Sequence, residues 1–282
     1  MEQLRILSHN LWKNDRNRPA WQQQGLDCSA GARMPRFAQL YAELMPDIMA
    51  LQEVSQQMAA LLMQELSAMQ LPYTLIEGGD TPILCRTDRF SLMHSEFSRY
   101  PETIPALQGS FNNYGSKSYC IAVLRHAESG KVLTASSTHL WWKSSDPKSP
   151  KYQPFSDEAR LWQLQQLCGR LDTLRQQYGC AALLAGDLNA VLCSPALQSA
   201  FSQGWQHARF LASACDGDFS GLHRCGAGGY DTVLPQSSFS QSIDHILCKG
   251  ADEDSVLRYF RHMPQSALSL SDHAAVCTDV LL

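Results

Sequence analysis

Apolar and polar positions follow two periods along this chain, one typical of helices and one typical of strands. Apolar residues at helical spacing predict helices from Pro35 to Met45, over residues 57–69, and over a longer stretch after Ser156. Ser156 is expected to cap that longest helix and Gly179 to end it. A short helix is expected to begin at Ser194–Pro195, because proline suits the first turn of a helix.

Short apolar or alternating runs, broken by Gly, Pro and Asp, predict many strands between these helices. The strands are expected at residues 4–10, 48–51, 73–76, 82–85, 90–93, 119–124, 131–140, 181–186, 243–248 and 273–281. Residues 202–240 are predicted to be rich in loops, with a turn at "DGD" (216–218) and a flexible loop at "CGAGGYD" (225–231). We find no linker and no internal repeat, so we expect one domain over residues 1–282.

Polar residues that can take part in chemistry stand at or beside the ends of several predicted strands. They are Asn10, Glu53, His139, Asp187, Asn189, Asp244 and His273. Loops meet at strand ends, where binding and catalytic sites usually form. In "AALLAGDLNAV" (181–191), strand alternation would put Asp187 and Asn189 on one face, with Leu188 on the other. We therefore expect these polar residues to share one site.

Six short stretches, taken in chain order, resemble one family. They are "SHNLW" (8–12), "DIMALQEV" (47–54), "SSTHLWW" (136–142), "AGDLNAV" (185–191), "SIDHIL" (242–247) and "SDHAAV" (271–276). Their order and intervals resemble the endonuclease/exonuclease/phosphatase superfamily, the deoxyribonuclease-like metal-dependent phosphoesterases. The resemblance implies an α+β fold, a four-layer α/β/β/α sandwich of two mixed sheets with helices outside and a site at one end of the sheets.

A hard divalent cation is the cofactor that this resemblance implies. Glu53 is expected to be the principal metal ligand, with Asn10 and Asp272 lining the same site. Carboxylate and amide oxygens suit Mg²⁺ or Mn²⁺ and are not a zinc set. The alternative for Asn10 is the capping of a turn, which asparagine favours.

The resemblance also implies roles for the other polar residues. Asp187 would orient and help to deprotonate the attacking water, and Asn189 would bind a phosphoryl oxygen. His139 would stabilise charge on the phosphate or protonate the leaving group. Asp244 would hold His273 in its working tautomer, so that either Asp187 or His273 could be the base.

The loop "HLWWKSSDPKSPKY" (139–152) combines aromatic and basic residues beside the expected site. Such residues can stack on a base, pack on a sugar or touch a lipid interface. We assign Trp142 and Lys143 to substrate contact, and packing of Trp141 in the core is as good an interpretation as contact. Lys117 stands where relatives often carry an arginine near the phosphate.

The net charge of −4 and the pI near 6.1 argue against a protein whose main task is to grip long nucleic acid. Two positive segments, residues 12–36 and 141–152, are predicted to be loops that either steer an anionic ligand or are simply solvated. The candidate substrates are a nucleic acid, a small nucleotide or other phosphoester, an inositol phosphate and a phospholipid head group. The opposing hypothesis is a binding protein that keeps the fold without catalysis.

The amino-terminal stretch "MEQLRILSHNLW" has no signal-peptide pattern, and no apolar run is long enough to span a bilayer. The ten cysteines form no C-x-x-C pair and lie mostly in apolar runs, as in a reducing compartment. We therefore expect a cytoplasmic protein without a transmembrane segment, although a chain whose signal had been removed would begin in the same way. Nothing in the sequence indicates a protein partner.

Overall fold

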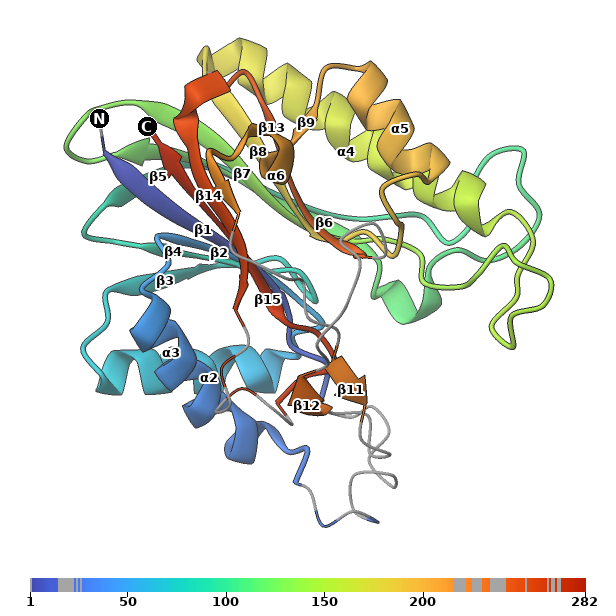
Figure 1. Ribbon diagram of the computed structural model, residues 1–282, viewed down its shortest axis with the longest axis horizontal. Helices are drawn as coiled ribbons and strands as arrows, with labels where there is room; N and C mark the ends of the chain where they lie inside the picture. Colours follow the sequence, from blue (N-terminus) through green and yellow to red (C-terminus); the bar gives the residue numbers. More distant parts are fainter. Residues whose placement is uncertain are drawn as a thin grey trace.

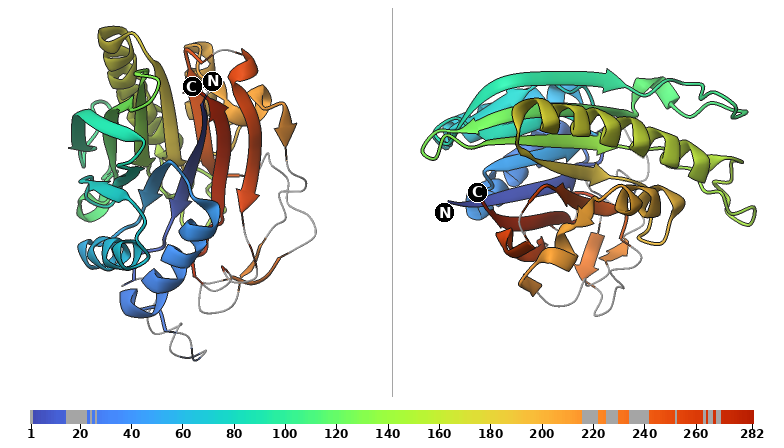
Figure 2. Two further views of the ribbon diagram at one scale, coloured as in Figure 1. Left: turned by 90° about the vertical axis from the view of Figure 1, so that its left-hand side faces the viewer. Right: turned by 90° about the horizontal axis from the view of Figure 1, so that it is seen from above.

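Two β-sheets lie face to face, and helices cover the outer face of each (Figure 1; Figure 2). This computed structural model describes residues 2–14, 23, 25, 27–215, 222–224, 230–233, 242–251, 253–262, 264, 267 and 270–282. The arrangement confirms the predicted four-layer α/β/β/α sandwich. The turn expected at 216–218 lies outside the described residues, as does most of the loop expected at 225–231.

The first sheet has seven strands in the order β10-β14-β15-β1-β2-β4-β3. Their bounds are β1 Gln3–Asn10, β2 Ile48–Gln52, β3 Tyr73–Ile76, β4 Ile83–Arg86, β10 Ala214–Cys215, β14 Val256–His262 and β15 Ala275–Leu281. Strand β1 is parallel to β2 and antiparallel to β15, so the sheet is mixed.

The second sheet has six strands in the order β5-β6-β7-β8-β13-β9. Their bounds are β5 Phe90–Arg99, β6 Ser118–His126, β7 Val132–His139, β8 Ala181–Asp187, β9 Gln206–His207 and β13 Asp244–Lys249. Strands β7 and β8 are parallel, and β8 and β13 are antiparallel. A separate antiparallel pair consists of β11, Leu222–Arg224, and β12, Tyr230–Val233.

The helices form the two outer layers. They are α2 Ala30–Leu44, α3 Gln56–Ala68, α4 Ser156–Tyr178, α5 Pro195–Ser202 and the short α6 Ala208–Leu211, with 3-10 turns at Asn113–Gly115 and Glu253–Ser255. Helices α2 and α3 pack on the seven-stranded sheet, and α4 and α5 pack on the six-stranded sheet. Within the described residues, no helix is both long enough and apolar enough to cross a membrane.

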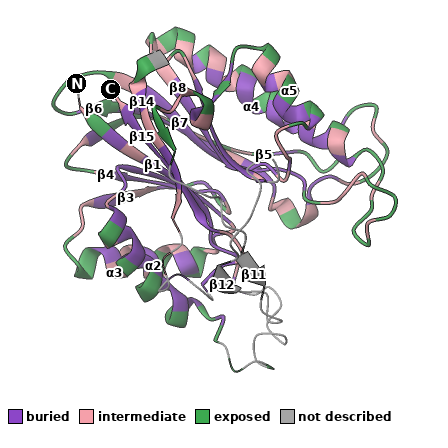
Figure 3. Ribbon diagram, in the orientation of Figure 1, coloured by how far each residue is buried: buried purple, intermediate pink, exposed green. Residues whose placement is uncertain are grey.

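The strands of both sheets are largely buried (Figure 3). Strand alternation divides this core into layers. On β8, Leu183 and Ala185 belong to the apolar cluster between the two sheets, whereas Ala182 and Leu184 face α4 and α5. On β1, Ile6 faces the other sheet and Leu7 faces α2 and α3. A polar residue two positions further along either strand therefore projects into the space between the sheets.

Two of the predicted helix starts were wrong. Helix α2 begins at Ala30 rather than at Pro35, because the hydroxyl of Ser29 accepts a hydrogen bond from the Ala32 N–H at 3.2 Å and caps the helix earlier. At α4 the residue before the helix is Phe155, and Ser156 is already helical, with its hydroxyl donating to the Gln153 carbonyl. The predicted end at Gly179 is confirmed, since this glycine follows the last turn with a φ of 60°.

Several strand predictions also differ from the structure. Strand β5 continues to Arg99, beyond the predicted residue 93, and β14 was not predicted at all. The burial pattern of β14 does not alternate regularly, and its register against β15 shifts between Val256 and Arg258. Irregular pairing of this kind removes the period of two on which the strand prediction relies.

The positive segment at 12–36 is not the loop that we expected. Arg33 and Arg36 lie in α2, and Arg33 is buried. Lys13 pairs with both carboxylate oxygens of Asp80 at 3.0 Å. Arg16 and Arg18 lie outside the described residues. Among the described residues, this segment therefore offers few free charges for steering a ligand.

Candidate active site at one end of the two sheets

Three predicted site residues stand side by side in the six-stranded sheet. Asp187, at the end of β8, pairs with His139 on β7 and with Asp244 on β13. Because alternation continues from Leu183 and Ala185 to Asp187, this carboxylate lies on the face toward the other sheet. The same alternation places Asp244 on that face, two positions before Ile246.

The seven-stranded sheet brings further residues to the same end. Asn10 ends β1 and pairs with Gln52, so that Glu53 follows directly at the end of β2. Asp272 and His273 precede β15, the other neighbour of β1. The Asn10 Nδ2 donates to Asp187 Oδ2 at 3.0 Å, which joins the two sheets at the centre of the site.

Asp187 is the central acid of the site. It is buried, and its pKa is raised to about 6, because burial disfavours the charged carboxylate and the nearby charge of Asp244 adds to the effect. The charges of His273 and Lys117 and the hydrogen bond from Asn10 partly offset this shift. The carboxyl is thus a stronger base than an ordinary aspartate and is still mostly ionised at neutral pH.

Asp244 and His273 form a close ion pair. His273 Nδ1 lies 2.8 Å from Asp244 Oδ2, and His273 Nε2 lies 3.8 Å from Asp187 Oδ2. Burial would lower the pKa of His273, but the charges of Asp244 and Asp272 raise it well above its ordinary value. Burial would likewise raise the pKa of Asp244, but the charge of His273 and its hydrogen bond leave it lowered. The pair holds the imidazole with Nε2 toward Asp187.

His139 meets Lys117 on the other side of Asp187. The Lys117 Nζ lies 2.6 Å from His139 Nε2, and the same Nε2 lies 3.4 Å from Asp187 Oδ2 and 4.0 Å from Glu53 Oε1. An ammonium can only donate, so His139 Nε2 accepts, which requires the ring proton on Nδ1. Lys117 is only 3% exposed, which places a buried positive charge within this acidic cluster.

Two sets of residues here could hold a divalent cation. The predicted set is Glu53, Asn10 and Asp272, and Glu53 has a φ of 54°, a left-handed conformation that turns it away from the line of β2. A second set, Asp187, Asp244 and His273, has ligand atoms that all lie within 4.8 Å of one another. Asp244 Oδ1 is buried, and no hydrogen bond reaches it from the described residues. The carboxylate and amide oxygens of both sets fit a hard cation such as Mg²⁺ or Mn²⁺, and His273 adds a ring nitrogen to the second set.

The chain matches the endonuclease/exonuclease/phosphatase family over residues 7–273. It belongs to this family. The match confirms the resemblance on which the sequence analysis relied, and members of the family are phosphoesterases. No curated protein matches the chain.

Solved structures from this family share the fold. An endonuclease/exonuclease/phosphatase from Bacteroides vulgatus is 18% identical, with 100% of each chain covered and a TM-score of 0.74. The mannosyl-6-phosphatase of Bacteroides thetaiotaomicron is 19% identical, with 99% of this chain and 100% of that chain covered and a TM-score of 0.74. D. rerio TDP2, complexed with a single-strand DNA product, is 17% identical, with 100% of each chain covered and a TM-score of 0.64. At these identities the likeness establishes the fold alone.

Asn189 does not continue the strand as we expected. Strand β8 ends at Asp187, and Asn189 has a φ of 47°, so the alternation that would put both on one face stops between them. The Asn189 N–H instead donates to Asp187 Oδ1 at 2.9 Å, and its Nδ2 donates to the Leu140 carbonyl at 3.1 Å. Asn189 therefore reaches the site through a turn that also orients Asp187.

The aromatic and basic loop after His139 is partly core. Trp141 is buried and packs against Phe111. Of the two interpretations of Trp141, core packing is therefore correct and substrate contact is not. Trp142 is 37% exposed, and the ammonium groups of Lys143 and Lys151 lie 5.9 and 5.4 Å from its ring centre. Two positive charges thus gather on one exposed indole.

One buried group beside the site, Arg33, was not predicted from the sequence. Arg33 falls four residues before Phe37 on the apolar stripe of α2, and a charged residue on such a stripe is the signal that could have identified it. His245, which alternation turns away from Asp244, contacts His207 and donates to the Ala190 carbonyl at 2.8 Å.

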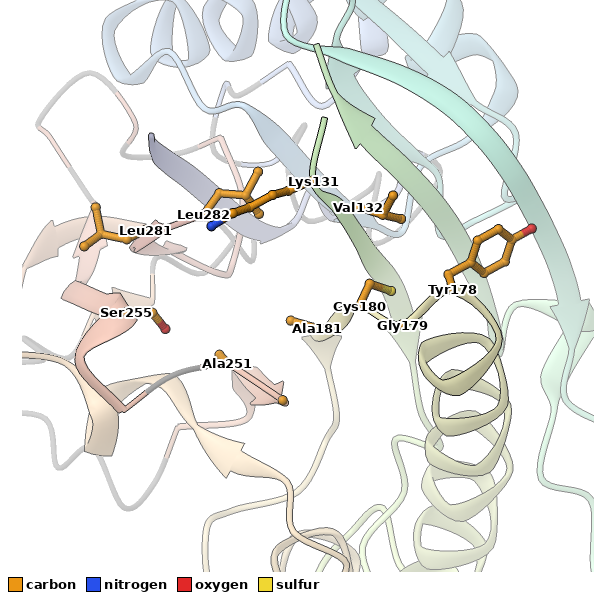
Figure 4. A pocket seen from close by; sticks show the side chains of 11 residues that line it. Lys131, Val132, Tyr178, Gly179, Cys180, Ala181, Ala251, Ser255, Leu281 and Leu282 are labelled. Carbon is orange, nitrogen blue, oxygen red and sulfur yellow. The ribbon is translucent and has the colours of Figure 1, made fainter. Parts of the chain in front are cut away.

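A pocket of about 370 Å³ lies at the opposite ends of the strands (Figure 4). Its lining includes Ala181, the first residue of β8, and Leu281, the last of β15. Because Asp187 ends β8 and His273 precedes β15, this pocket is separate from the candidate active site.

Proposed function

We propose that this chain is a divalent-metal-dependent hydrolase that cleaves a phosphodiester or phosphomonoester bond by in-line attack of water. The observation that carries the proposal is the Asn10–Asp187 hydrogen bond, which joins the predicted metal ligands of the seven-stranded sheet to Asp187, His139 and Asp244 of the six-stranded sheet. Membership of a phosphoesterase family supports the same reaction class. Nuclease and phosphatase activities are both compatible with this site.

Asp187 and His273 are proposed to handle the attacking water. Asp187, with a pKa of about 6, accepts a hydrogen bond from the water and helps to remove its proton. His273 Nε2 lies 3.8 Å from Asp187 Oδ2, so the protonation of the two groups is coupled, and the raised pKa of His273 makes it the group that holds a proton beside the ionised Asp187. Asp244 fixes the imidazole by its bond to Nδ1.

The other groups are proposed to act on the phosphate. Lys117 and His139, 2.6 Å apart, are proposed to stabilise negative charge on the phosphate, with the Lys117 ammonium as the positive charge and His139 Nε2 orienting it. The half-exposed Asn189 binds a phosphoryl oxygen with its side-chain amide.

Glu53, Asn10 and Asp272 are proposed to hold Mg²⁺ or Mn²⁺, with Asp187, Asp244 and His273 as the alternative set. When bound, such a cation neutralises phosphate oxygens and so lowers the barrier to attack. The Asn10 Oδ1 accepts the Trp12 N–H at 2.9 Å, as the turn-capping alternative requires, and the remaining lone pair of Oδ1 is proposed to bind the cation.

The substrate is proposed to be a nucleic acid, a nucleotide or another small phosphoester. Trp142 and Lys143 would contact the group beyond the phosphate, and the neighbouring Lys151 favours a substrate with additional negative charge. A phospholipid or inositol phosphate is the alternative within the same reaction class. The described cysteines are all free thiols, which supports a location in the reducing cytoplasm.

The decisive experiment is a titration of the metal-free protein with Mg²⁺, Mn²⁺ and Ca²⁺ against an aryl phosphodiester and an aryl phosphomonoester. We expect turnover that requires metal, and a loss of at least about a hundredfold in kcat/KM for Glu53→Ala. Glu128→Ala, an exposed residue in the turn between β6 and β7, is the matched control and should retain full activity. A folded protein that shows no turnover with any metal on a wide phosphoester panel would favour the non-catalytic binding protein.

A further inference from the structure

Arg33 is a buried cation that makes hydrogen bonds to backbone carbonyls of three chain segments. It lies in α2 and is 1% exposed. Its Nη1 donates to the Leu11 carbonyl at 2.8 Å and to the Leu270 carbonyl at 2.7 Å. Its Nη2 donates to the Trp12 carbonyl at 2.6 Å, and its Nε donates to the Cys28 carbonyl at 3.1 Å. A planar guanidinium offers five N–H donors on three nitrogens and can reach these separate carbonyls together, whereas an ammonium offers three donors on a single nitrogen.

Two of these segments carry the proposed metal ligands. Leu11 and Trp12 follow Asn10 directly, and Leu270 stands two residues before Asp272. A second bond ties the same segments together, since the Ser271 hydroxyl donates to the Asn10 carbonyl at 2.7 Å. Arg33 therefore sits at the junction of the loop after β1 and the loop before β15.

The turn at Trp12 connects Arg33 to the side chains of the proposed metal ligands. Trp12 has a φ of 52°, a conformation that costs energy for a bulky residue and persists only where neighbouring bonds enforce it. In this turn the Trp12 N–H donates to Asn10 Oδ1 at 2.9 Å, and the Lys13 N–H donates to Glu53 Oε2 at 3.2 Å. Arg33 holds the carbonyl between these two N–H groups.

The charge of Arg33 also acts on the site. Burial lowers the pKa of Arg33 to about 10, and the negative charges of Asp272 and Glu53 oppose that shift. The guanidinium thus remains charged at neutral pH and lies close enough to both carboxylates to interact with them.

We infer that Arg33 is a positioning residue for the metal site: by clamping the carbonyls of Leu11, Trp12 and Leu270, it arranges Asn10, Glu53 and Asp272 before any cation binds. This inference rests on the proposed metal-dependent function. It assigns to Arg33 no contact with substrate and no part in proton transfer.

The test measures Mn²⁺ binding in the absence of substrate. Electron paramagnetic resonance detects the free ion, so the bound fraction is obtained by difference. Arg33→Lys keeps the charge and loses the planar fork, and Arg33→Met loses both. We expect the Mn²⁺ affinity of both variants to fall roughly 10–100-fold, as is typical when a group that orients metal ligands is removed. Arg36→Lys, an exposed arginine of the same helix, is the matched control and should bind Mn²⁺ like the wild type.

The outcomes separate the two hypotheses. Mn²⁺ affinity within twofold of wild type in a folded Arg33→Lys, even with a lowered Tm, would show that Arg33 is merely structural. Unchanged affinity in Arg33→Lys would also be expected if only the positive charge of residue 33 mattered, because lysine keeps that charge. In either case the inference would be overturned. A wild type that binds neither Mn²⁺ nor Mg²⁺ would instead overturn the proposed function, and the inference with it.

A second measurement keeps the inference testable if the variants do not fold. Hydrogen exchange of the Trp12, Lys13 and His273 amides, all of which donate within this network, is followed in the metal-free wild type. We expect slow exchange that changes little when Mg²⁺ is added, because the network exists without the cation. If these amides exchanged at the rates of an unprotected amide until Mg²⁺ was added, the site would not be arranged before the cation binds, and the inference would be contradicted.

Discussion

A residue without a side chain sets the distance between β7 and β8 beside the site. Gly186 immediately precedes Asp187, and a Cβ at this position would overlap the carbonyl oxygen of Thr138 on β7. Thr138 and Gly186 pair in the parallel ladder one step before His139 and Asp187. Backbone atoms cannot give way as a flexible side chain would, so the close approach depends on glycine.

We predict that Gly186→Ala separates the two strands at His139 and Asp187. The expected result is a loss of more than about tenfold in kcat/KM together with a lower Tm, because both the pairing and the site depend on this approach. Gly31→Ala, in the first turn of α2 with no atom near the added methyl group, is the control. Full activity of Gly186→Ala would mean that the strands adjust without moving the site.

Buried histidines make the stability of this protein depend on pH. His207 Nδ1 accepts the Arg209 N–H at 3.1 Å, so its Nε2 carries the proton toward His245. Burial lowers the pKa of His207 well below its ordinary value of 6.5. Below pH 6.5 His207 therefore binds a proton in the unfolded chain but not in the folded chain. The free energy of unfolding decreases as the pH falls below this value.

We predict that the free energy of unfolding of the wild type decreases more steeply between neutral and mildly acidic pH than that of His207→Gln. The difference should approach about 1.4 kcal/mol per pH unit. Urea denaturation at several pH values measures it. Since His273 has a raised pKa and contributes the opposite slope, the comparison must be between variant and wild type. Parallel slopes would exclude His207 as the source.

Single residues were predictable where their chain neighbours carried the information. The stretch around Asp187 was visible in the local sequence, whereas the pairing of Asp244 with His273 followed from the family resemblance, and the structure brings these two within 2.8 Å. Arg33 was not predicted as part of the site, because its partners at Leu270 and Leu11 are 237 and 22 residues away along the chain. Every residue has a backbone carbonyl group, so the residue types at these positions do not indicate which carbonyls accept hydrogen bonds from Arg33.

At the scale of elements, α4 illustrates how one residue type acts in opposite ways. Gly169 lies in the interior of the helix on its exposed face, and Gly179 follows the helix with a φ of 60°. An added Cβ meets no atom within 4 Å at either position. Backbone conformation alone therefore decides the effect of a substitution.

We predict that Gly169→Ala stabilises the protein by about 0.5–1 kcal/mol, because alanine loses less backbone entropy in a helix. Gly179→Ala should destabilise it by about 1 kcal/mol, because alanine resists the left-handed conformation. Urea denaturation of the two variants, each with unchanged activity, checks both signs. The same sign for both substitutions would contradict this account.

Elements were predicted well where the period was regular and poorly where long-range pairing decided the structure. Strand β8 and helix α3 appeared within a residue of their predicted bounds. Strand β14 was missed because its bulged pairing with β15 leaves no regular alternation. The start of α2 moved because a cap at Ser29 outweighed the preference of proline for a first turn.

At the scale of the whole molecule, the sandwich serves to bring two sets of strand ends together. The seven-stranded sheet supplies Asn10, Glu53 and Asp272, and the six-stranded sheet supplies Asp187 and Asp244. The sequence could predict the fold because six stretches along the chain carry the family pattern. The substrate group beyond the phosphate could not be predicted, because it depends on loops such as that around Trp142, which depart from that pattern.

The order of strands in the seven-stranded sheet has a consequence for how the protein is made. Strand β15 lies between β14 and β1, yet it is the last of these strands to leave the ribosome. During synthesis β1 must therefore wait with one edge unpaired, and Asp272 and His273 arrive only with the segment that closes this gap. A nascent chain that lacks this segment therefore lacks one hydrogen-bonded neighbour of β1 and two of the residues at the candidate site.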